Sequence, residues 1–196
     1  MSSLPHAPAA LRNRQAIWDV IAPFISSGDH LLEIASGTGQ HIEYMAKRRS
    51  DITWQPSDAR EDILWAIDVR LSSFDHVAQA KHIDVCRAKW QALQYDSLLC
   101  INMIHIAPWE ACTSLFSRAQ PKKYLFLYGP FSEHGIHNSQ GNIQFDASLR
   151  AQQSSWGIRD IDDLKALAHT HGFVLDARFA MPANNQTLVW KKSLVH

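Results

Sequence analysis

The sequence contains little cysteine, and this scarcity excludes one class of protein at once. Among 196 residues there are three cysteines, Cys86, Cys100 and Cys112, and no two of them have C-x-x-C spacing. A disulfide-rich scaffold is excluded, and we expect reduced thiols in a cytoplasmic protein. The chain also lacks any run of about 18 apolar residues, and its start, "MSSLPHAPAALRNRQ", lacks an apolar core. We therefore expect neither a membrane span nor a secretion signal.

An excess of charge of one sign is also missing. The 19 Lys and Arg residues balance 19 Asp and Glu residues, and apart from "KRR" at 47–49 the basic residues are scattered. Because no broad basic surface is indicated, we do not expect nucleic acid as a partner. The pairs His134 and His137, and His169 and His171, have no cysteine or acidic partner at zinc spacing, so we expect no metal site.

Apolar patterning predicts strands and helices that alternate along most of the chain. A helical cap over 1–26 precedes the alternation. The predicted strands cover residues 30–35, 52–58, 77–85, 95–106, 122–131, 173–181 and 187–192. The predicted helices cover residues 39–49, 60–74, 108–120 and 160–172, and residues 132–142 are predicted as a loop.

This alternation favours an α/β fold with a doubly wound, mostly parallel sheet that carries helices on both faces. The fourth predicted strand, "YDSLLCINMIHI", is nearly continuous in apolar residues, as expected of a strand covered on both sides. The segment "PANNQ" between the last two strands predicts a hairpin, so the sheet should end in an antiparallel pair. No linker interrupts the chain, and we expect a single domain over 1–196.

A turn of small residues, "ASGTGQ", follows the first predicted strand. Gly37 and Gly39 lack side chains, so a ligand can approach the backbone while the next helix offers free amides to an anionic group. A dinucleotide site needs G-x-G-x-x-G, but Ile42 stands at the third glycine. The acid-x-G-x-G-x-G pattern of S-adenosylmethionine sites fits better, because Glu33 precedes the turn and only Ala35 departs from it. Such turns also occur for packing alone.

Two further acidic residues end the next two strands. Asp58 lies 19 residues after Gly39, about where a doubly wound fold places a carboxylate that binds a ribose diol. Asp84 could accept a hydrogen bond from an adenine amino group, and the Val85 amide could reach a ring nitrogen. Each aspartate could instead cap a turn or a helix. Together with Glu33, however, they place a carboxylate at three successive strand ends, which favours an adenosine site.

Several blocks of the sequence resemble a known family. The blocks are "LLEIASGTGQH", "WQPSD", "INMIHIAPW", "YGPF", "GN-x-x-FD", "WGIRD" and "MPANN". In combination they are similar to the signature of a poorly characterised methyltransferase-like family, a domain of unknown function with predicted class I S-adenosylmethionine-dependent methyltransferases. The similarity extends from "RNR" at 12–14 to the end of the chain.

The resemblance implies a Rossmann-like, class I methyltransferase fold, with a seven-stranded sheet whose last strand is antiparallel. It also implies cofactor contacts at the end of the fourth strand and at four earlier positions, Glu33, Gly37, Asp58 and Asp84. It names no substrate. Ala35 departs from the usual glycine pattern.

The ends of the fourth and fifth strands supply candidates for the chemistry. Methyl transfer needs alignment more than reactive groups, but a base is useful when the acceptor carries a proton. His105 is the candidate base, and Tyr128 is the second candidate catalytic residue. Asn102 is expected to contact the cofactor or to hold the loop. A purely structural role for His105 remains open.

Other polar and aromatic residues are expected around the substrate. We expect an aromatic wall of Tyr128, Phe131 and Trp109, with amides and a carboxylate from Asn142, Asp146, Asn184 and Asn185. The two adjacent asparagines could instead serve the hairpin turn. Arg12 and Asn13 could close over the cofactor's carboxylate, or could belong to a solvated helix face.

These patterns favour methyl transfer from S-adenosylmethionine to a small polar or aromatic metabolite. Two alternatives stay open: a cofactor-binding module without catalysis, and a nicotinamide-dependent oxidoreductase, which Ile42 argues against. The sequence does not indicate the oligomeric state.

Overall fold

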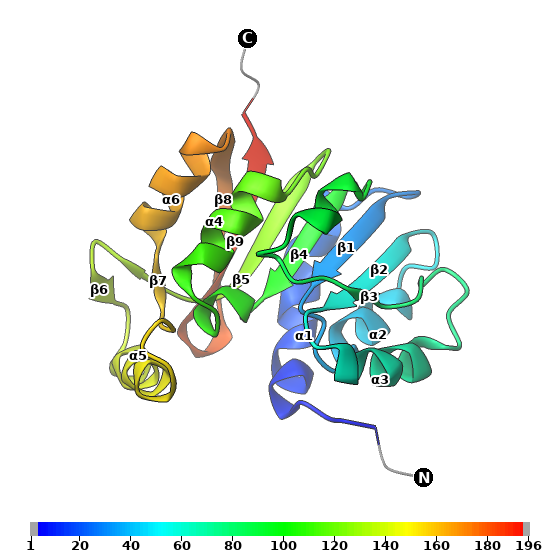
Figure 1. The fold of residues 1–196 in the computed structure, drawn as a ribbon, viewed down its shortest axis with the longest axis horizontal. Helices are drawn as coiled ribbons and strands as arrows, with labels where there is room; N and C mark the ends of the chain where they lie inside the picture. Colours follow the sequence, from blue (N-terminus) through cyan, green and yellow to red (C-terminus); the bar gives the residue numbers. More distant parts are fainter. Residues whose placement is uncertain (1–3, 194–196) are drawn as a thin grey trace.

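The strands form one sheet over residues 4–193, the part of the chain that the computed structural model describes (Figure 1). Its main path is β3-β2-β1-β4-β5-β9-β8, and β6 and β7 both pair with β5. The strands are β1 (His30–Ile34), β2 (Thr53–Asp58), β3 (Lys81–His82), β4 (Ser97–Ile101), β5 (Tyr124–Glu133), β6 (Ile136–His137), β7 (Arg159–Asp160), β8 (Phe173–Met181) and β9 (Asn185–Lys192).

The pairing confirms the predicted topology. β1 lies parallel to β2 and β4, and β5 lies parallel to β4. β9 runs antiparallel between β5 and β8, as the terminal hairpin predicts. The order reverses at β1, since the chain adds β2 and β3 on one side and β4 on the other. Ligands of doubly wound sheets bind beyond the carboxyl ends of the strands at this reversal.

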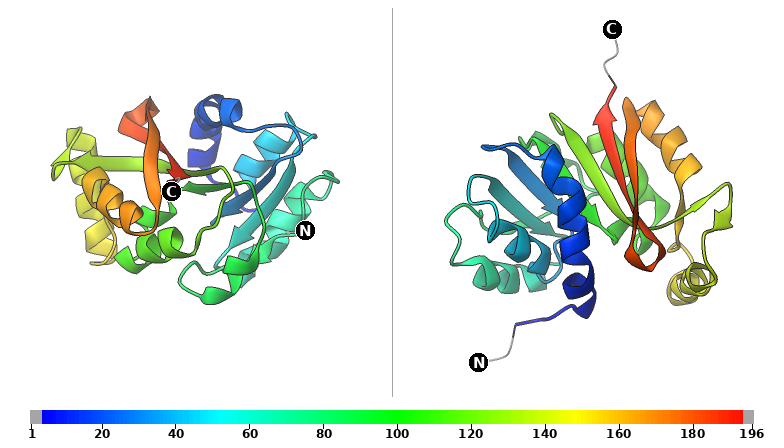
Figure 2. Two further views of the ribbon diagram at one scale, coloured as in Figure 1. Left: turned by 90° about the horizontal axis from the view of Figure 1, so that it is seen from above. Right: turned by 180° about the vertical axis from the view of Figure 1, so that it is seen from behind.

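Helices cover both faces of the sheet (Figure 2). They are α1 (Pro8–Ile21), α2 (Gln40–Ala46), α3 (Glu61–Leu71), α4 (Trp109–Arg118), α5 (Gln140–Gln152) and α6 (Ile161–Thr170). Helices α4 and α6 bury one apolar cluster against the sheet, and α1, α2 and α3 bury the other. Side chains of β4 alternate between them, because Leu98 and Cys100 join the first cluster while Leu99 and Ile101 join the second. This double coverage explains why the strand is apolar throughout.

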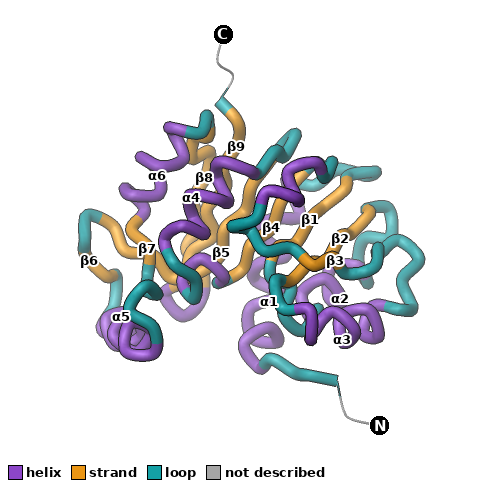
Figure 3. Tube along the Cα trace, viewed as in Figure 1, coloured by secondary structure: helices purple, strands orange, loops and turns teal. Residues whose placement is uncertain are grey.

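The segment 132–142 differs from the predicted loop. β5 continues to Glu133, β6 follows it, and α5 begins at Gln140 (Figure 3). Ser139 caps this helix, because its hydroxyl oxygen accepts a 3.1 Å hydrogen bond from the Asn142 amide. The apolar pattern of α5 is weak, since the helix buries little more than Leu149 among its apolar residues. The helix therefore gives almost no periodic signal.

The third predicted strand is also shorter than expected. β3 contains only Lys81 and His82, and an isolated bridge joins Val77 to Trp54. Within residues 4–193, no helix combines the length and the apolar character needed to cross a membrane.

Candidate active site

Residues with left-handed backbone conformation gather where the parallel strands end, along the lower edge of the sheet in Figure 1. Ala35, Asn102, Ala183 and Asn184 have φ angles of 57°, 60°, 57° and 58°. They follow β1, β4 and β8. This conformation is costly for residues other than glycine, and such residues concentrate at functional sites.

The two glycines of the turn after β1, Gly37 and Gly39, have different surroundings. Both have positive φ angles, 57° at Gly37 and 74° at Gly39. A Cβ atom added at Gly37 would meet nothing within 4 Å, so this backbone faces open space. A Cβ atom added at Gly39 would lie 3.3 Å from Ile67 Cγ2 of α3. Gly39 therefore allows α3 to pack closely; it does not line the cavity over the ends of β1, β2 and β3, and its contact with the cofactor stays a prediction.

Asp58 joins the ends of β1 and β2. Its carboxylate accepts hydrogen bonds from the Gly37 amide at 2.8 Å and from the Arg60 amide at 3.0 Å. The adjacent Ser57 amide donates to Ser36 Oγ at 3.1 Å. Each Asp58 oxygen keeps a further lone pair, so the carboxylate can hold the turn and still accept hydrogen bonds from a ligand.

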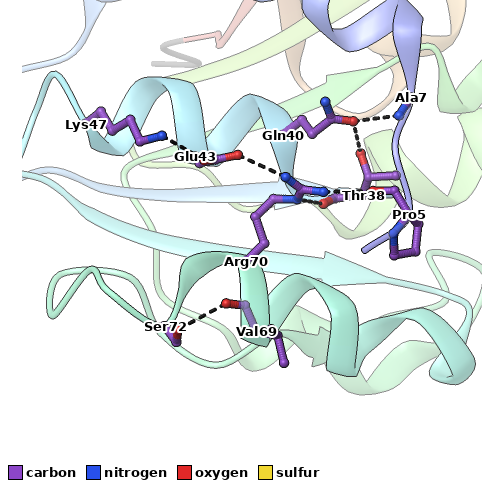
Figure 4. A network of polar contacts seen from close by, with 9 residues as sticks. All are labelled: Pro5, Ala7, Thr38, Gln40, Glu43, Lys47, Val69, Arg70 and Ser72. Carbon is purple, nitrogen blue, oxygen red and sulfur yellow. Dashed lines mark hydrogen bonds and ion pairs between the residues drawn. The ribbon is translucent and has the colours of Figure 1, made fainter. Parts of the chain in front are cut away.

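A second network holds the same turn from outside (Figure 4). The guanidinium of Arg70 on α3 donates to the Thr38 carbonyl at 2.7 Å and to the Pro5 carbonyl at 2.7 Å. Gln40 Oε1 accepts from the Ala7 amide at 2.6 Å and from the Thr38 hydroxyl at 2.8 Å. These bonds tie the N-terminal segment and α3 to the turn, which fixes the shape of its inner side.

A cavity of about 390 Å³, here called the first cavity, opens over the ends of β1, β2 and β3. Five residues predicted to bind the cofactor line it: Ala35, Gly37, Asp58, Asp84 and Val85. The remaining lining is mostly apolar and comes from Ile34, Ala59, Arg60, Ile63, Ile83, Cys86, Ile101, Met103, Ile106, Ala107, Pro108 and Ala111. Apolar walls with a few polar groups at one end are typical of small-molecule sites.

Asp84 is more exposed than Asp58. Its Oδ1 accepts a 2.9 Å hydrogen bond from the Cys86 amide, and its Oδ2 lies 3.4 Å from Arg87 Nε. The carboxylate thus stabilises its own turn while standing at the rim of the first cavity.

Glu33 does not belong to the lining of the first cavity. It is 1% exposed, and burial raises its pKa from 4.5 to about 7, with the negative charge of Asp58 acting in the same direction. Within residues 4–193 its Oε2 has no hydrogen-bond partner, and its Oε1 lies 4.0 Å from His41 Nδ1. The carboxyl group is buried beside His41, and its predicted contact with the cofactor stays a prediction.

His41 connects this buried carboxyl group to α1. Its Nε2 lies 2.9 Å from Asn13 Oδ1, and burial lowers its pKa from 6.5 to about 4. The imidazole is therefore neutral at neutral pH. The sequence analysis did not identify His41, because a single histidine inside a helix carries no distinctive spacing.

A larger cavity of about 620 Å³, here called the second cavity, lies beside the first. Seven predicted site residues line it: Arg12, Asn13, Asn102, His105, Tyr128, Asn142 and Asn185. No sequence pattern indicates four other lining residues, Ala9, Phe145, Pro182 and Ala183, and Pro130 and Ile106 complete the lining. Ile106 lines both cavities, so a molecule in one lies next to a molecule in the other. α1, β5, α5 and the β8–β9 hairpin all contribute.

His105 is neutral and held by packing. It is 1% exposed, and its ring meets Phe131 edge to face with 5.0 Å between centroids. Burial, helped by the positive charge of Arg159, lowers its pKa from 6.5 to about 3. Neither ring nitrogen has a hydrogen-bond partner within the described part of the chain. An imidazole with so low a pKa binds protons poorly, which favours the structural role over the predicted general base.

Tyr128 lies at the base of the second cavity and is 3% exposed. Burial raises the pKa of its hydroxyl, while the side chains of Asn13 and Asn185 beside it act in the opposite direction. The phenol is therefore protonated at neutral pH and can donate a hydrogen bond.

Four predicted substrate residues lie outside the lining of the second cavity. Phe131 is fully buried in the core, and Trp109 packs near Arg159, with 5.8 Å between the guanidinium carbon and the ring centroid. Asp146 accepts from the Ile158 amide at 2.6 Å and from Arg150 Nε at 2.7 Å.

Asn184, the fourth, contributes its carbonyl, which accepts a 3.2 Å hydrogen bond from Asn142 Nδ2. None of the four residues lines the second cavity, so their substrate roles stay predictions. Sequence adjacency to a site residue does not fix the direction of a side chain, and each of these positions serves packing or a local network.

Among residues 4–193 there is no group of three or more His, Cys, Asp or Glu that could hold a metal ion. The three cysteines are free thiols.

The comparison with protein families follows this geometry. The profile of a family described as "Protein of unknown function (DUF938)" matches residues 4–192. The chain belongs to the DUF938 family. The match spans almost the whole sequence and agrees with the methyltransferase-like resemblance of the sequence blocks.

Solved methyltransferase structures share the fold at low sequence identity. An O-methyltransferase family protein from Burkholderia thailandensis is 13% identical with a TM-score of 0.77, over 94% of this chain and 57% of that chain. A candidate sarcosine dimethylglycine methyltransferase from Galdieria sulphuraria is 12% identical with a TM-score of 0.73, over 94% and 87%. The calicheamicin-biosynthesis methyltransferase CalO1, bound to S-adenosylhomocysteine, is 11% identical with a TM-score of 0.72, over 93% and 55%.

The DUF938 chain therefore has a class I, Rossmann-like methyltransferase fold. It spans little more than half the length of the first of these structures, 57% of that chain.

Proposed function

We propose that this DUF938 protein transfers a methyl group from S-adenosylmethionine to a small polar or aromatic metabolite. The observation that carries the proposal is the first cavity, where a bare glycine backbone and two aspartates face one apolar space. The second cavity, which shares Ile106 with the first, gives the acceptor a place beside the methyl group. The fold shared with methyltransferases supports the same reaction.

The first cavity fits an adenosine. Gly37 leaves open space where a side chain would stand, so the backbone can touch a ligand. Asp58 keeps lone pairs for the two ribose hydroxyls after it has accepted its backbone bonds. Asp84 and Val85 stand at the far end for the adenine edge, against the walls formed by Ile63 and Ile83.

S-adenosylmethionine, when bound, supplies an activated methyl group on a sulfonium. The remaining task is to align the acceptor and to exclude water, and the protein needs few reactive groups for it. Tyr128 and the amides of Asn102, Asn142 and Asn185 surround the second cavity and can orient polar groups of the acceptor. Phe145 adds an aromatic surface at the mouth. The three free thiols fit a protein of the reducing cytosol.

Calorimetric titration with S-adenosylhomocysteine tests the cofactor. We expect one molecule to bind per chain, and Asp58→Ala to weaken binding by about ten- to a hundredfold, because a charge-assisted hydrogen bond is lost. Asp62→Ala is the matched control, since Asp62 lies on the exposed side of α3 with its side chain 77% exposed. Unchanged affinity in Asp58→Ala would place the cofactor elsewhere.

Two parallel measurements address the alternatives. A fluorescence titration with NADH should show no binding, because Ile42 stands where a dinucleotide site needs its third glycine. Turnover of radiolabelled S-adenosylmethionine with a metabolite extract should separate an enzyme from a binding module. Binding of S-adenosylhomocysteine without any labelled product would favour the module.

A further inference from the structure

The second cavity contains one permanent charge, and this charge is positive. Arg12 lines the cavity from α1 and is exposed. No hydrogen bond or ion pair joins its guanidinium to another group within residues 4–193. No aspartate, glutamate, lysine or cysteine belongs to the lining. The cavity therefore offers a free cation to a ligand and nothing that repels an anion.

The same lining offers no effective base. Its other titratable side chains are those of His105 and Tyr128. His105 is a buried neutral imidazole whose pKa is about 3, and Arg159 further disfavours its protonation. Tyr128 is protonated, because burial raises its pKa. Neither group can take a proton from a neutral hydroxyl or an ammonium at neutral pH.

This inventory restricts the acceptor. When an oxyanion attacks, its lone pair forms the new carbon–oxygen bond as the sulfur–carbon bond breaks, and the electron pair of that bond neutralises the sulfonium. The oxyanion becomes a neutral ester or aryl ether, so charges balance and no proton is released. A neutral alcohol or an alkylammonium would have to lose a proton, which no side chain of the second cavity can accept.

We propose that the methyl acceptor is a small organic anion that presents a deprotonated oxygen, a carboxylate or an acidic phenolate, with Arg12 holding its charge. This inference rests on the proposed methyl transfer and names the substrate class of the same site. It also revises the expectation for Arg12, which lines the second cavity and is absent from the lining of the first. Phe145 and Pro130 provide flat walls against which a planar acceptor can lie.

Binding of three probes of similar size tests the proposal without knowledge of the natural acceptor. Benzoate, benzyl alcohol and benzylammonium are titrated into protein saturated with S-adenosylhomocysteine, and ligand-observed NMR gives the dissociation constants. We expect benzoate to bind about tenfold or more tightly than the other two, as a charge-assisted contact requires. In Arg12→Gln the preference should disappear while the affinity for S-adenosylhomocysteine stays within about twofold.

Arg14→Gln is the matched control. It removes the same charge two positions along α1, from a side chain that stacks on Tyr44 and does not line the second cavity. This variant should keep the preference for benzoate.

The outcomes separate this inference from the proposed function. If S-adenosylhomocysteine binds but benzoate shows no advantage, or none of the probes binds, the anionic acceptor is refuted and the methyltransferase proposal stands. If Arg12→Gln weakens S-adenosylhomocysteine binding about tenfold or more, Arg12 holds the cofactor and the inference is refuted. If S-adenosylhomocysteine itself does not bind, the proposed function fails first.

Discussion

The two cavities of this protein are built in different ways. The first takes its lining from the ends of β1, β2, β3 and β4 and from the start of α4, and its charged groups are two aspartates and Arg60. The second collects residues from α1, β5, α5 and the β8–β9 hairpin, and its polar groups are amides, a phenol, an imidazole and a guanidinium. The doubly wound fold alone brings strand ends together, whereas the second cavity needs segments that the fold leaves free to vary.

This contrast fits the proposed function, in which the first cavity binds the cofactor and the second binds the acceptor. A cofactor that is the same for many enzymes is held where topology dictates the geometry. An acceptor that differs between enzymes is held where insertions and helices can change. In this chain the contrast extends to charge, since two aspartates and one arginine line the first cavity, whereas the second has Arg12 and no carboxylate in its lining.

The largest expected effect on the free energy of unfolding concerns Glu33, the buried carboxyl group at the end of β1. Glu33 has a raised pKa, about 7 against 4.5, so its contribution to stability is fully present below pH 4.5 and is lost as pH rises through 7. Glu33→Gln replaces the titrating carboxyl group with a neutral amide, so the variant should not lose this stability as the pH rises. At pH 8 we expect the variant to be more stable than the wild type by about 3 kcal/mol, with no difference near pH 4. Urea unfolding across this range measures the difference.

Glu43→Gln serves as the control with the opposite sign. Partial burial acts to raise the pKa of Glu43, but the hydrogen bonds and charges of Lys47 and Arg70 together outweigh it and lower this pKa, so the substitution should reduce stability above pH 4.5. The Glu33→Gln variant could instead be no more stable than the wild type at pH 8. This result would show that a partner stabilises the charged form of the buried carboxyl group.

A second substitution should damage the second cavity and spare the first. A Cβ atom at Gly129 would lie 2.6 Å from His105 Cδ2 and 3.3 Å from Asn102 Oδ1, so the buried imidazole must move. We expect Gly129→Ala to cost about 1 to 3 kcal/mol of stability. Calorimetry should show the affinity for S-adenosylhomocysteine changed by less than about threefold, because neither His105 nor Gly129 lines the first cavity.

Gly141→Ala provides the comparison for Gly129→Ala. Its Cβ atom would meet only Ser139 Oγ at 3.8 Å, and the position is helical, so we expect a small gain in stability. If Gly129→Ala were as stable as Gly141→Ala, the tight packing around His105 would be refuted. A loss of S-adenosylhomocysteine binding in Gly129→Ala would instead show that the two cavities are not independent.

The smallest effect tests the strained turn of the first cavity. Ala35 has a φ angle of 57°, where alanine is about 1 kcal/mol less favourable than glycine. Ala35→Gly should therefore raise the unfolding free energy by about 0.5 to 1 kcal/mol. Ala66→Gly, in the middle of α3, should lower it by a similar amount. If both Ala35→Gly and Ala66→Gly lowered the unfolding free energy, the left-handed conformation at Ala35 would be contradicted.

The sequence predicts the first cavity better than the second, for a physical reason. Four residues of its lining lie at or just after the end of a strand: Ala35, Gly37, Asp58 and Asp84. The carboxyl ends of parallel strands share one edge of the sheet. Strand periodicity and order are thus enough to bring them together. Glu33 is buried and does not line the first cavity, because the pattern does not encode the direction of its side chain.

The second cavity depends on features with little periodic signal. Asn142 and Phe145 lie on α5; the predicted loop over 132–142 covers only the start of this helix, and the sequence gives no helical pattern for the rest. Phe131 and Asp146 are polar or aromatic neighbours of true lining residues, yet Phe131 faces the core and Asp146 binds the Ile158 amide. Which neighbour faces a cavity is decided by tertiary packing, which a single sequence does not show.

A crystal structure with S-adenosylhomocysteine tests the central claim most directly. We expect the adenine beside Asp84 and Val85, and both ribose hydroxyls within about 3 Å of the Asp58 carboxylate. The sulfur should point toward Ile106 and the second cavity. A ligand bound elsewhere, or a first cavity closed by side chains of the protein in the presence of saturating ligand, would contradict it.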